Sequence, residues 1–252
     1  MEQKKKKIVF RNEWKYLISY PEANLLRDRL APFTHLDPHT INGQYTIRSL
    51  YFDDYWDSAY NTKIAGSDNR KKWRIRIYNC TDDVISLERK TKRNNYIYKQ
   101  SARLTKDEFY RILDGDYGFL LSRKENLCGE FYVELTSNLL RPKVTVDYER
   151  IPMILDEGTT RITLDMDVRA GYGTYDIFDV NMPVISAMEP EKLVLEVKWT
   201  EFLPGLVKKL LPCQGQEFTA VSKYTLCYEA AHFFTDVTAG ISKTALNWRK
   251  ER

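Results

Sequence analysis

The sequence contains few of the residues that build disulfide frameworks, zinc sites or histidine-based catalytic centres. It has four cysteines in 252 residues, without a CxxC pair, and three histidines. The cysteines are Cys80, Cys128, Cys213 and Cys227, and the histidines are His35, His39 and His232. Such scattered thiols argue against a disulfide framework or a zinc site and favour reduced thiols in the cytoplasm. The dispersed histidines argue against a histidine-based metal site or catalytic triad.

Long apolar runs and a strong charge imbalance are also missing. No stretch approaches the roughly 20 apolar residues of a membrane-spanning helix, and the start, MEQKKKK, has no apolar segment typical of a secretory signal. Thirty-nine basic and thirty-five acidic residues leave a net charge of +4, too small to indicate a nucleic-acid-binding protein. With no linker or repeat, we expect one domain over residues 1–236 and a C-terminal tail, which can be helical, over residues 237–252.

The stretch from Lys71 to Lys90, KKWRIRIYNCTDDVISLERK, predicts two strands joined by a turn. Side chains of a strand alternate between the two faces of a sheet. One face of this hairpin would carry Lys72, Arg74, Arg76, Glu88 and Lys90, and the other Trp73, Ile75, Ile77 and Leu87. Like charges on paired strands repel each other, so this face suggests a bound anion. A hairpin whose charged face is simply exposed to water is the alternative.

Six further segments alternate in the same way and are predicted strands: residues 8–18, 45–53, 96–104, 143–155, 161–168 and 192–200. Helices are expected after the caps Ser19, Asp53, Thr105 and Ser222, and over residues 122–140 and 203–211, which gives an α+β protein. The charged faces supply Lys15, Arg48, Lys99, Arg103, Arg161 and Lys198, and the carboxylates Glu13, Asp165 and Glu196. An open sheet could expose these charges to water. A closed sheet with the charges inside would need a polyanion and a divalent metal, because unpaired buried charges are costly.

Eight motifs in order along almost the whole chain resemble the VTC domain, the catalytic domain of the vacuolar transporter chaperone polyphosphate polymerase. These motifs are RNEWKYLIS (11–19), RSLYFD (48–53), KWRIRIY (72–78), LERK (87–90), YER (148–150), RITLD (161–165), LEVKW (195–199) and SKY (222–224). The VTC domain is a triphosphate tunnel metalloenzyme related to the CYTH enzymes. The resemblance implies an eight-stranded antiparallel β-barrel tunnel with helices packed outside.

The resemblance also implies the site residues. The catalytic residues would be Lys15, Arg74, Arg76, Lys90, Arg161 and Lys223. The same residues, with Arg48, Arg150 and Lys198, would bind substrate phosphates, and Glu196 would bind Mn²⁺ or Mg²⁺ with Glu13 and Glu88 as further metal ligands. Simple alternation places Arg150 on the apolar face of its strand, so a bulge near Pro152 would have to turn it, or Glu149 would point inward instead.

The implied activity is transfer of the γ-phosphoryl group of ATP to a growing polyphosphate chain. A terminal phosphate is ionised near neutral pH, so this transfer needs no general base. Arg11 stands where CYTH hydrolases usually have glutamate, and this favours the polymerase branch. A tripolyphosphate or nucleoside triphosphate hydrolase of the same fold, and a non-catalytic polyphosphate-binding module, are the alternatives.

The expected partners are ATP and inorganic polyphosphate. We expect no nucleic acid and no membrane span, and a membrane-associated partner stays open. Neither the SPX domain nor the membrane helices of the eukaryotic complex is expected in this chain, and the sequence does not specify an oligomeric state.

Overall fold

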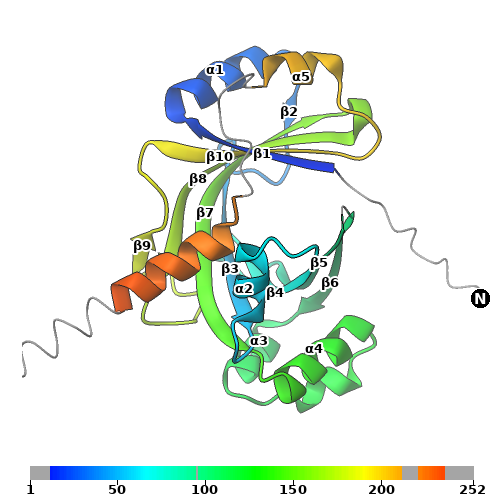
Figure 1. Ribbon diagram of the computed structural model, residues 1–252, viewed down its shortest axis with the longest axis vertical. Helices are drawn as coiled ribbons and strands as arrows, with labels where there is room; N and C mark the ends of the chain where they lie inside the picture. The colour runs from blue at the N-terminus through cyan, green and yellow to red at the C-terminus, as the bar shows by residue number, and fades with distance from the viewer. Residues whose placement is uncertain (1–11, 95, 212–220, 236–252) are drawn as a thin grey trace, which may run out of the picture.

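The structure is a computed structural model that describes residues 12–94, 96–211 and 221–235. One antiparallel sheet dominates it, with the strand order β1-β10-β8-β7-β3-β4-β5-β6, while β2 pairs with β7 and β9 pairs with β8 (Figure 1). The strands are β1 (Asn12–Ser19), β2 (His35–Leu36), β3 (Tyr45–Asp53), β4 (Asn69–Tyr78), β5 (Ile85–Arg93), β6 (Tyr96–Leu104), β7 (Arg141–Leu155), β8 (Thr160–Gly171), β9 (Val184–Ser186) and β10 (Lys192–Trp199). Arg11 and the predicted tail at 237–252 lie outside the described residues.

The sheet is strongly curled. Lys90 of β5 lies 3.2 Å from a carboxylate oxygen of Glu13 on β1, although six steps in the strand order separate β1 from β5. Only a sheet that bends back on itself can bring these side chains together. The predicted fold of eight antiparallel strands with helices outside is confirmed, in the form of a half-barrel. β1 and β6 are the two ends of the strand order, and in the described part of the chain no backbone pairing joins them.

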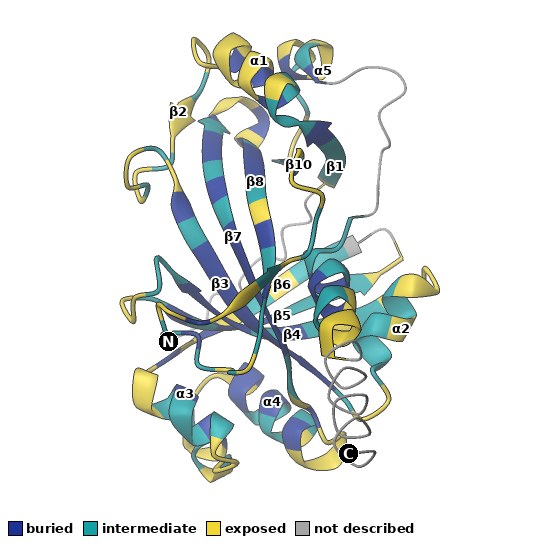
Figure 2. Cartoon of the chain, turned by 90° about the vertical axis from the view of Figure 1, so that its left-hand side faces the viewer, coloured by how far each residue is buried: buried dark blue, intermediate teal, exposed yellow. Residues whose placement is uncertain are grey.

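Helices cover the outer face of the sheet in two groups (Figure 2). The first group packs on β3 to β6 through a core that includes Trp73, Ile75 and Phe131, and the second packs on β1, β8 and β10 through Leu26, Leu164 and Leu195. The first group is α3 (Lys106–Leu113), the 3-10 turn Gly118–Ser122 and α4 (Asn126–Ser137), and the second is α1 (Tyr20–Leu30) and α5 (Gly205–Leu210). The predicted capping box at Thr105 is confirmed, and the predicted cap Ser19 also forms a capping box, with Glu22. No described helix is long and apolar enough to cross a membrane.

Part of the inner face is apolar because a helix covers it. The helix over residues 223–235 packs on β3, β7 and β8 through Tyr224 and Cys227, which contact a cluster that includes Val144 and Val146. Val144, Val146, Tyr148 and Arg150 all share this inner face, since they pair with alternate residues of β3. Arg150 therefore faces inward without any bulge near Pro152.

The bulge between β7 and β8 lies elsewhere. Their register shifts between Asp147 and Glu149, opposite Asp167 of β8, whose φ is +49°. One extra residue on β8 at this point changes which of its side chains face inward. Thr163 and Asp165 face inward before the bulge, and Val168 and Ala170 join the inner apolar cluster after it.

A buried carboxylate fastens the helix at 223–235 to α2 (Ser58–Ile64). Asp53 is 2% exposed, and its Oδ1 accepts a hydrogen bond from the backbone N–H of Ala59 in the first turn of α2, although the N-cap residue of that helix is Asp57. Its Oδ2 accepts hydrogen bonds from the N–H of Tyr60 at 3.1 Å and from the Tyr224 hydroxyl at 2.6 Å. Burial and the Asp53 carboxylate raise the pKa of Tyr224, so this hydroxyl stays a donor.

Removal of that hydroxyl tests the attachment. We expect Tyr224→Phe to lower the free energy of unfolding by about 2 kcal/mol, because one buried hydrogen bond to a charged acceptor is lost while the ring still stacks on Tyr51. Urea denaturation followed by circular dichroism measures the change. Tyr55→Phe is the control, because the Tyr55 side chain is 73% exposed. Equal stability of Tyr224→Phe and the control would contradict this account.

Candidate functional site

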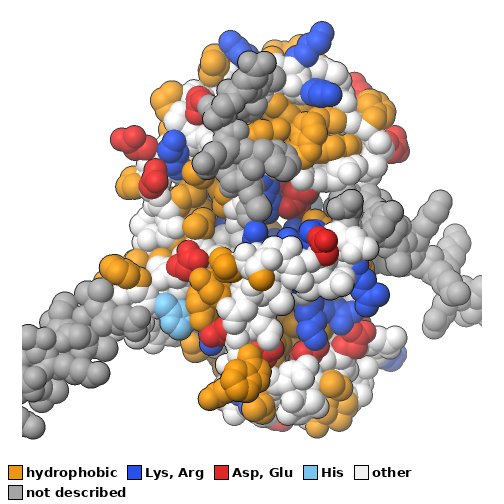
Figure 3. Space-filling view, viewed as in Figure 1, with side chains coloured by type: hydrophobic (Ala, Val, Ile, Leu, Met, Phe, Trp, Pro, Cys, Tyr) orange, Lys and Arg blue, Asp and Glu red, His pale blue; other side chains and the backbone are white. Residues whose placement is uncertain are grey.

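The inner face of the curled sheet contains a cavity of about 330 Å³ with an unusual excess of cations (Figure 3). Eleven lysine and arginine side chains line it, against two glutamates. The cations are Lys15, Lys63, Arg70, Lys72, Arg74, Arg76, Lys90, Lys92, Arg150, Lys198 and Lys223, and the glutamates are Glu13 and Glu196. We call this cavity the channel. Cations so close together repel each other unless an anion lies between them.

Strand alternation on β4 and β5 supplies the largest group of these cations. Arg70, Lys72, Arg74 and Arg76 occupy every second position of β4, so all four point to the inner face. Their cross-strand neighbours include Lys92 opposite Arg70 and Lys90 opposite Lys72. Two directly opposed like-charge pairs destabilise a hairpin, so this arrangement is costly unless it serves binding.

Two carboxylates that line the channel share one ammonium group. The Lys15 Nζ lies 3.0 Å from Glu13 and 3.3 Å from Glu196, which come from the neighbouring strands β1 and β10. Lys90 also contacts Glu13, and Lys198 contacts Glu196 at 2.7 Å. Burial opposes ionisation of Glu13, but Lys15 and Lys90 outweigh it and lower its pKa to about 2. Burial likewise opposes ionisation of Glu196, but Lys198 and Lys15 hold its pKa well below the ordinary value.

A second buried carboxylate cluster positions Arg150 and Lys223. Asp165 is fully buried and accepts two hydrogen bonds from the Arg150 guanidinium, at 2.6 and 2.7 Å. Lys223 reaches the same carboxylate at 2.5 Å from the start of the helix at 223–235. Arg150 also lies 3.4 Å from Glu196, which links the two clusters. Paired, buried charges of this kind are held in fixed positions.

Arg74 is positioned by a carboxylate and a hydroxyl group, and Arg76 by hydroxyl groups. Arg74 donates to the Tyr51 hydroxyl at 2.7 Å and also pairs with Glu88. Arg76 donates to Ser49 Oγ at 3.0 Å and to the Tyr148 hydroxyl at 3.3 Å. Within the described residues Arg76 has no ion-pair partner, although it is only 7% exposed. A buried guanidinium without a carboxylate is suited to bind an anionic ligand.

Lys72 is a second cation without a carboxylate in the described chain. Its Nζ donates to Ser222 Oγ at 3.0 Å and lies 4.6 Å from the centre of the Tyr224 ring. Burial lowers the pKa of Lys72 well below the ordinary value, and the nearby charges of Lys15 and Lys63 lower it further. A bound anion would offset the nearby positive charges and raise the pKa of Lys72 again.

The structure brings together most of the residues predicted for the site. The channel contains the predicted Lys15, Arg74, Arg76, Lys90, Arg150, Lys198 and Lys223, and the predicted metal ligands Glu13 and Glu196. Glu88 is set apart from the other two glutamates. It lies on β5, where it accepts hydrogen bonds from Arg74 and from Lys99.

Arg48 and Arg161 are placed outside the channel. On β3 the inward row runs through Ser49 and Tyr51, so Arg48 points to the opposite face, where it donates to Asp147 at 2.6 Å and to the carbonyl oxygen of Asp179. Arg161 shares the inner face with Lys198, its cross-strand neighbour. Its guanidinium, however, donates to Asp37 and to the Tyr45 hydroxyl.

Several channel residues were not among the predicted site residues. Lys72 was on the predicted charged face but was not chosen as a site residue, and extension of the charged rows by one step along β4 and β5 would have found Arg70 and Lys92. Asp165 does not line the channel but holds Arg150 and Lys223 in it, and the sequence showed it only as a carboxylate on a predicted strand. Lys63 comes from α2, and no pattern in the sequence connects it with the sheet.

This fold and channel define a protein of the tunnel-fold class, in which an antiparallel sheet curls around a charged interior. The model of the VTC domain matches residues 10–232, and the chain therefore belongs to the VTC domain family. None of the curated protein sequences matches the chain.

Solved structures share the fold at low sequence identity. A proposed adenylyl cyclase from Hippeastrum, described as having a dominant triphosphatase activity, is 17% identical, with a TM-score of 0.54 over 86% of this chain and 94% of that chain. A proposed adenylate cyclase from Bacillus halodurans is 14% identical, with a TM-score of 0.46 over 77% of this chain and 81% of that chain. A Pyrococcus horikoshii protein is 12% identical, with a TM-score of 0.47 over 87% and 99% of the two chains. The Hippeastrum structure supports the tunnel fold.

The charge on Lys72 provides a test of anion binding in the channel. Because the pKa of Lys72 is lowered, its ammonium group loses a proton at a lower pH than the ammonium group of an ordinary lysine. We expect tripolyphosphate to bind most tightly where Lys72 is protonated and to bind more weakly above its lowered pKa. In Lys72→Gln, the affinity should fall by about tenfold and its decrease with rising pH should become shallower.

Isothermal titration calorimetry at several pH values and in buffers of different ionisation enthalpy measures both effects. Proton uptake on binding should be smaller in Lys72→Gln than in the unsubstituted protein. Arg111→Gln is the control, because Arg111 lies on α3 and pairs with Asp116. If Lys72→Gln and the control give the same affinity and the same pH dependence, then Lys72 does not face the ligand.

Proposed function

We propose that this protein is a polyphosphate polymerase, which transfers the γ-phosphoryl group of ATP to the end of a polyphosphate chain inside the channel. The observation that carries this proposal is the convergence of eleven cations on one cavity that has only two lining carboxylates. A ligand with many phosphoryl groups would neutralise such a surface. Membership of the VTC domain family supports a polyphosphate-related activity.

The length of the cationic row favours two phosphate substrates over one. Arg70 and Arg76 are the ends of the inward row on β4, six residues apart. At about 3.3 Å per residue, the row extends over roughly 20 Å. It is longer than the three phosphoryl groups of one triphosphate, so it offers room for ATP and for the end of a chain.

The state of the channel carboxylates favours transfer to phosphate over transfer to water. A general base that activates water works best with a pKa near the operating pH. Lys15 and Lys90 lower the pKa of Glu13 against the effect of its burial, and cations likewise lower the pKa of Glu196 and Asp165 against theirs. These carboxylates are therefore weak bases. A terminal phosphate oxygen is already ionised and needs no base.

The channel residues then act by binding and orientation. The terminal oxygen of the chain forms a bond to the γ-phosphorus, and the bond from that phosphorus to the bridging oxygen breaks, so that ADP leaves with the electron pair and no proton is removed. Arg74 and Arg76 orient phosphoryl oxygens, because a guanidinium can donate two parallel hydrogen bonds. Lys15, Lys90 and Lys198 supply positive charge where negative charge concentrates in the transition state.

Glu13 and Glu196 fit a divalent metal. Two carboxylates near one ammonium group offer the hard oxygen donors that Mg²⁺ and Mn²⁺ prefer, and such ions commonly take their other ligands from phosphate and water. The described residues contain no cluster of three acidic, histidine or cysteine side chains, so phosphate and water would have to supply the remaining ligands. A metal held by these two glutamates would neutralise charge on the phosphoryl oxygens.

Incubation with ATP and Mn²⁺ or Mg²⁺ tests the proposal. We expect long polyphosphate chains together with ADP, separated by gel electrophoresis and quantified by phosphorus NMR. In Glu196→Gln, chain synthesis should fall by about a hundredfold or more, because loss of a metal ligand removes several kcal/mol of transition-state stabilisation. Arg111→Gln should keep full activity.

The products of the same incubation distinguish the polymerase from a hydrolase and from a non-catalytic binding module. Free phosphate without chains would identify a hydrolase and would contradict the polymerase. Tight binding of tripolyphosphate with no turnover under either metal, and unchanged binding in Glu196→Gln, would identify a non-catalytic binding module.

A further inference from the structure

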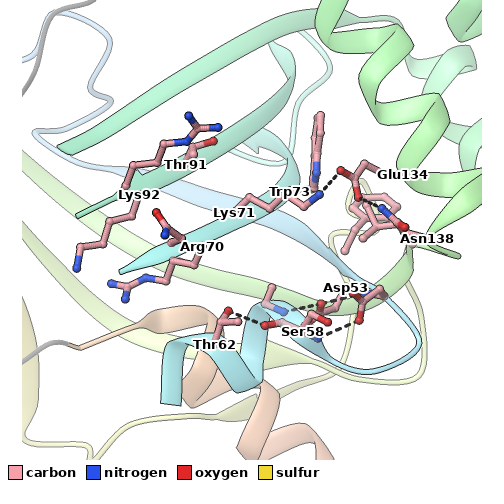
Figure 4. Close-up of a pocket in the computed structure, with 16 residues that line it drawn as sticks. Asp53, Ser58, Thr62, Arg70, Lys71, Trp73, Thr91, Lys92, Glu134 and Asn138 are labelled. Atoms are coloured by element: carbon pink, nitrogen blue, oxygen red, sulfur yellow. Dashed lines mark hydrogen bonds and ion pairs between the residues drawn. The ribbon is translucent and has the colours of Figure 1, made fainter. Parts of the chain in front are cut away.

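A second cavity, of about 580 Å³, lies beside the channel (Figure 4). Strands β4 and β5 form one side of it, α2 forms another, and α4 lies at one end. Its volume is in the range of pockets that hold small organic ligands, roughly 300 to 1,000 Å³. None of the residues predicted for the site lines it.

The walls of this cavity differ in chemistry from the walls of the channel. Phe52, Trp73 and Leu140 contribute apolar atoms to its wall, although these side chains are almost fully buried and Trp73 is only 1% exposed. Hydroxyl and amide groups of Thr62, Thr91 and Asn138 stand among them. Carboxylates also line it, from Asp53, Asp54 and Glu134. Apolar atoms beside groups that accept hydrogen bonds suit a planar heterocycle and the hydroxyls of a sugar. A polyphosphate chain would gain little from it.

Two cations connect this cavity to the channel. Arg70 and Lys92 line both cavities and stand opposite each other on β4 and β5. They lie at the end of the second cavity away from Glu134 and Asn138 (Figure 4). At that far end Lys71 forms an ion pair with Glu134, so its charge is neutralised there. Lys92 pairs with Asp68 at 2.9 Å, whereas Arg70 donates to the carbonyl oxygen of Ser67 and has no ion-pair partner among the described residues. Arg70 therefore carries the unpaired positive charge where the second cavity meets the channel.

We propose that the second cavity binds the nucleoside of a nucleoside triphosphate, whose phosphates pass Arg70 and Lys92 into the channel. This assignment rests on the proposed function and adds a nucleoside-specific site to it. A ligand with an uncharged aromatic end and a polyanionic end matches the two cavities in order. Tripolyphosphate lacks the aromatic end and uses the channel alone.

Calorimetric titration of the full chain with ATP and with inorganic tripolyphosphate tests this assignment. We expect ATP to bind about tenfold more tightly than tripolyphosphate. Thr62 lines the second cavity from α2, so Thr62→Trp should fill it. In this variant ATP should bind about tenfold more weakly, to the level of tripolyphosphate, while the affinity for tripolyphosphate stays the same. Asn61→Trp is the matched control, since Asn61 is its exposed neighbour on α2, and both affinities should be unchanged there.

A direct readout uses the indole N–H resonances in a ¹⁵N–¹H spectrum, with the Trp73 signal assigned from Trp73→Phe. ATP should shift that signal and tripolyphosphate should not. Equal affinities of the unsubstituted protein for ATP and tripolyphosphate would overturn the nucleoside site and leave the polymerase intact. Equal weakening of both ligands by Thr62→Trp would overturn it too, because phosphates alone would then occupy the cavity. Failure of both ligands to bind the unsubstituted protein would overturn the proposed function itself.

Discussion

Electrostatic repulsion among the cations of the inner face is the constraint on which the rest of the structure depends. Lys15, Arg150 and Lys223 are each held by a buried carboxylate, and these ion pairs fix their positions before any ligand arrives. Lys72 and Arg76 have only hydroxyl and aromatic neighbours as partners in the described chain. The carboxylates therefore hold the framework of the channel in place, and the remaining positive charge is available to a ligand.

Hydrophobic packing on the outer face of the sheet compensates for the repulsion among the cations of the inner face. Helices α3 and α4 bury one half of that face, and α1 and α5 bury the other. Apolar burial of this extent is the dominant favourable term in folding. The inner face can then carry charge, and its one apolar patch, around Val146, is covered by the helix that also delivers Lys223. The Asp53–Tyr224 hydrogen bond thus links the stability of that helix to the geometry of the channel.

The sequence alone predicted the eight long strands of the sheet, the helix caps at Ser19 and Thr105 and most of the channel, because these depend on local periodicity and short motifs. It did not predict β2 and β9, which have two and three residues and are too short to show a period. It placed Arg48 in the channel, since a charge on a strand does not reveal which face of that strand will turn inward. The neighbours of β3 decide this, and they turn Ser49 and Tyr51 inward. The sequence pattern misplaced Arg150 because it assumed that each strand has one charged face and one apolar face. The inner face of β7 carries both kinds of residue, since the helix at 223–235 covers its apolar part. Lys63 was missed because its approach to the sheet depends on tertiary packing alone.

The two proposals together assign a direction to the channel. If the nucleoside lies next to Arg70 and Lys92, the phosphates of ATP follow the row on β4 toward Arg74 and Arg76. The polyphosphate end would then approach the γ-phosphoryl group from the opposite side, where Arg150 is paired with Asp165. In-line attack requires the acceptor and the leaving group on opposite sides of the phosphorus. A row of cations that continues past one triphosphate meets this requirement, whereas a site closed behind the third phosphate would leave no place for the chain.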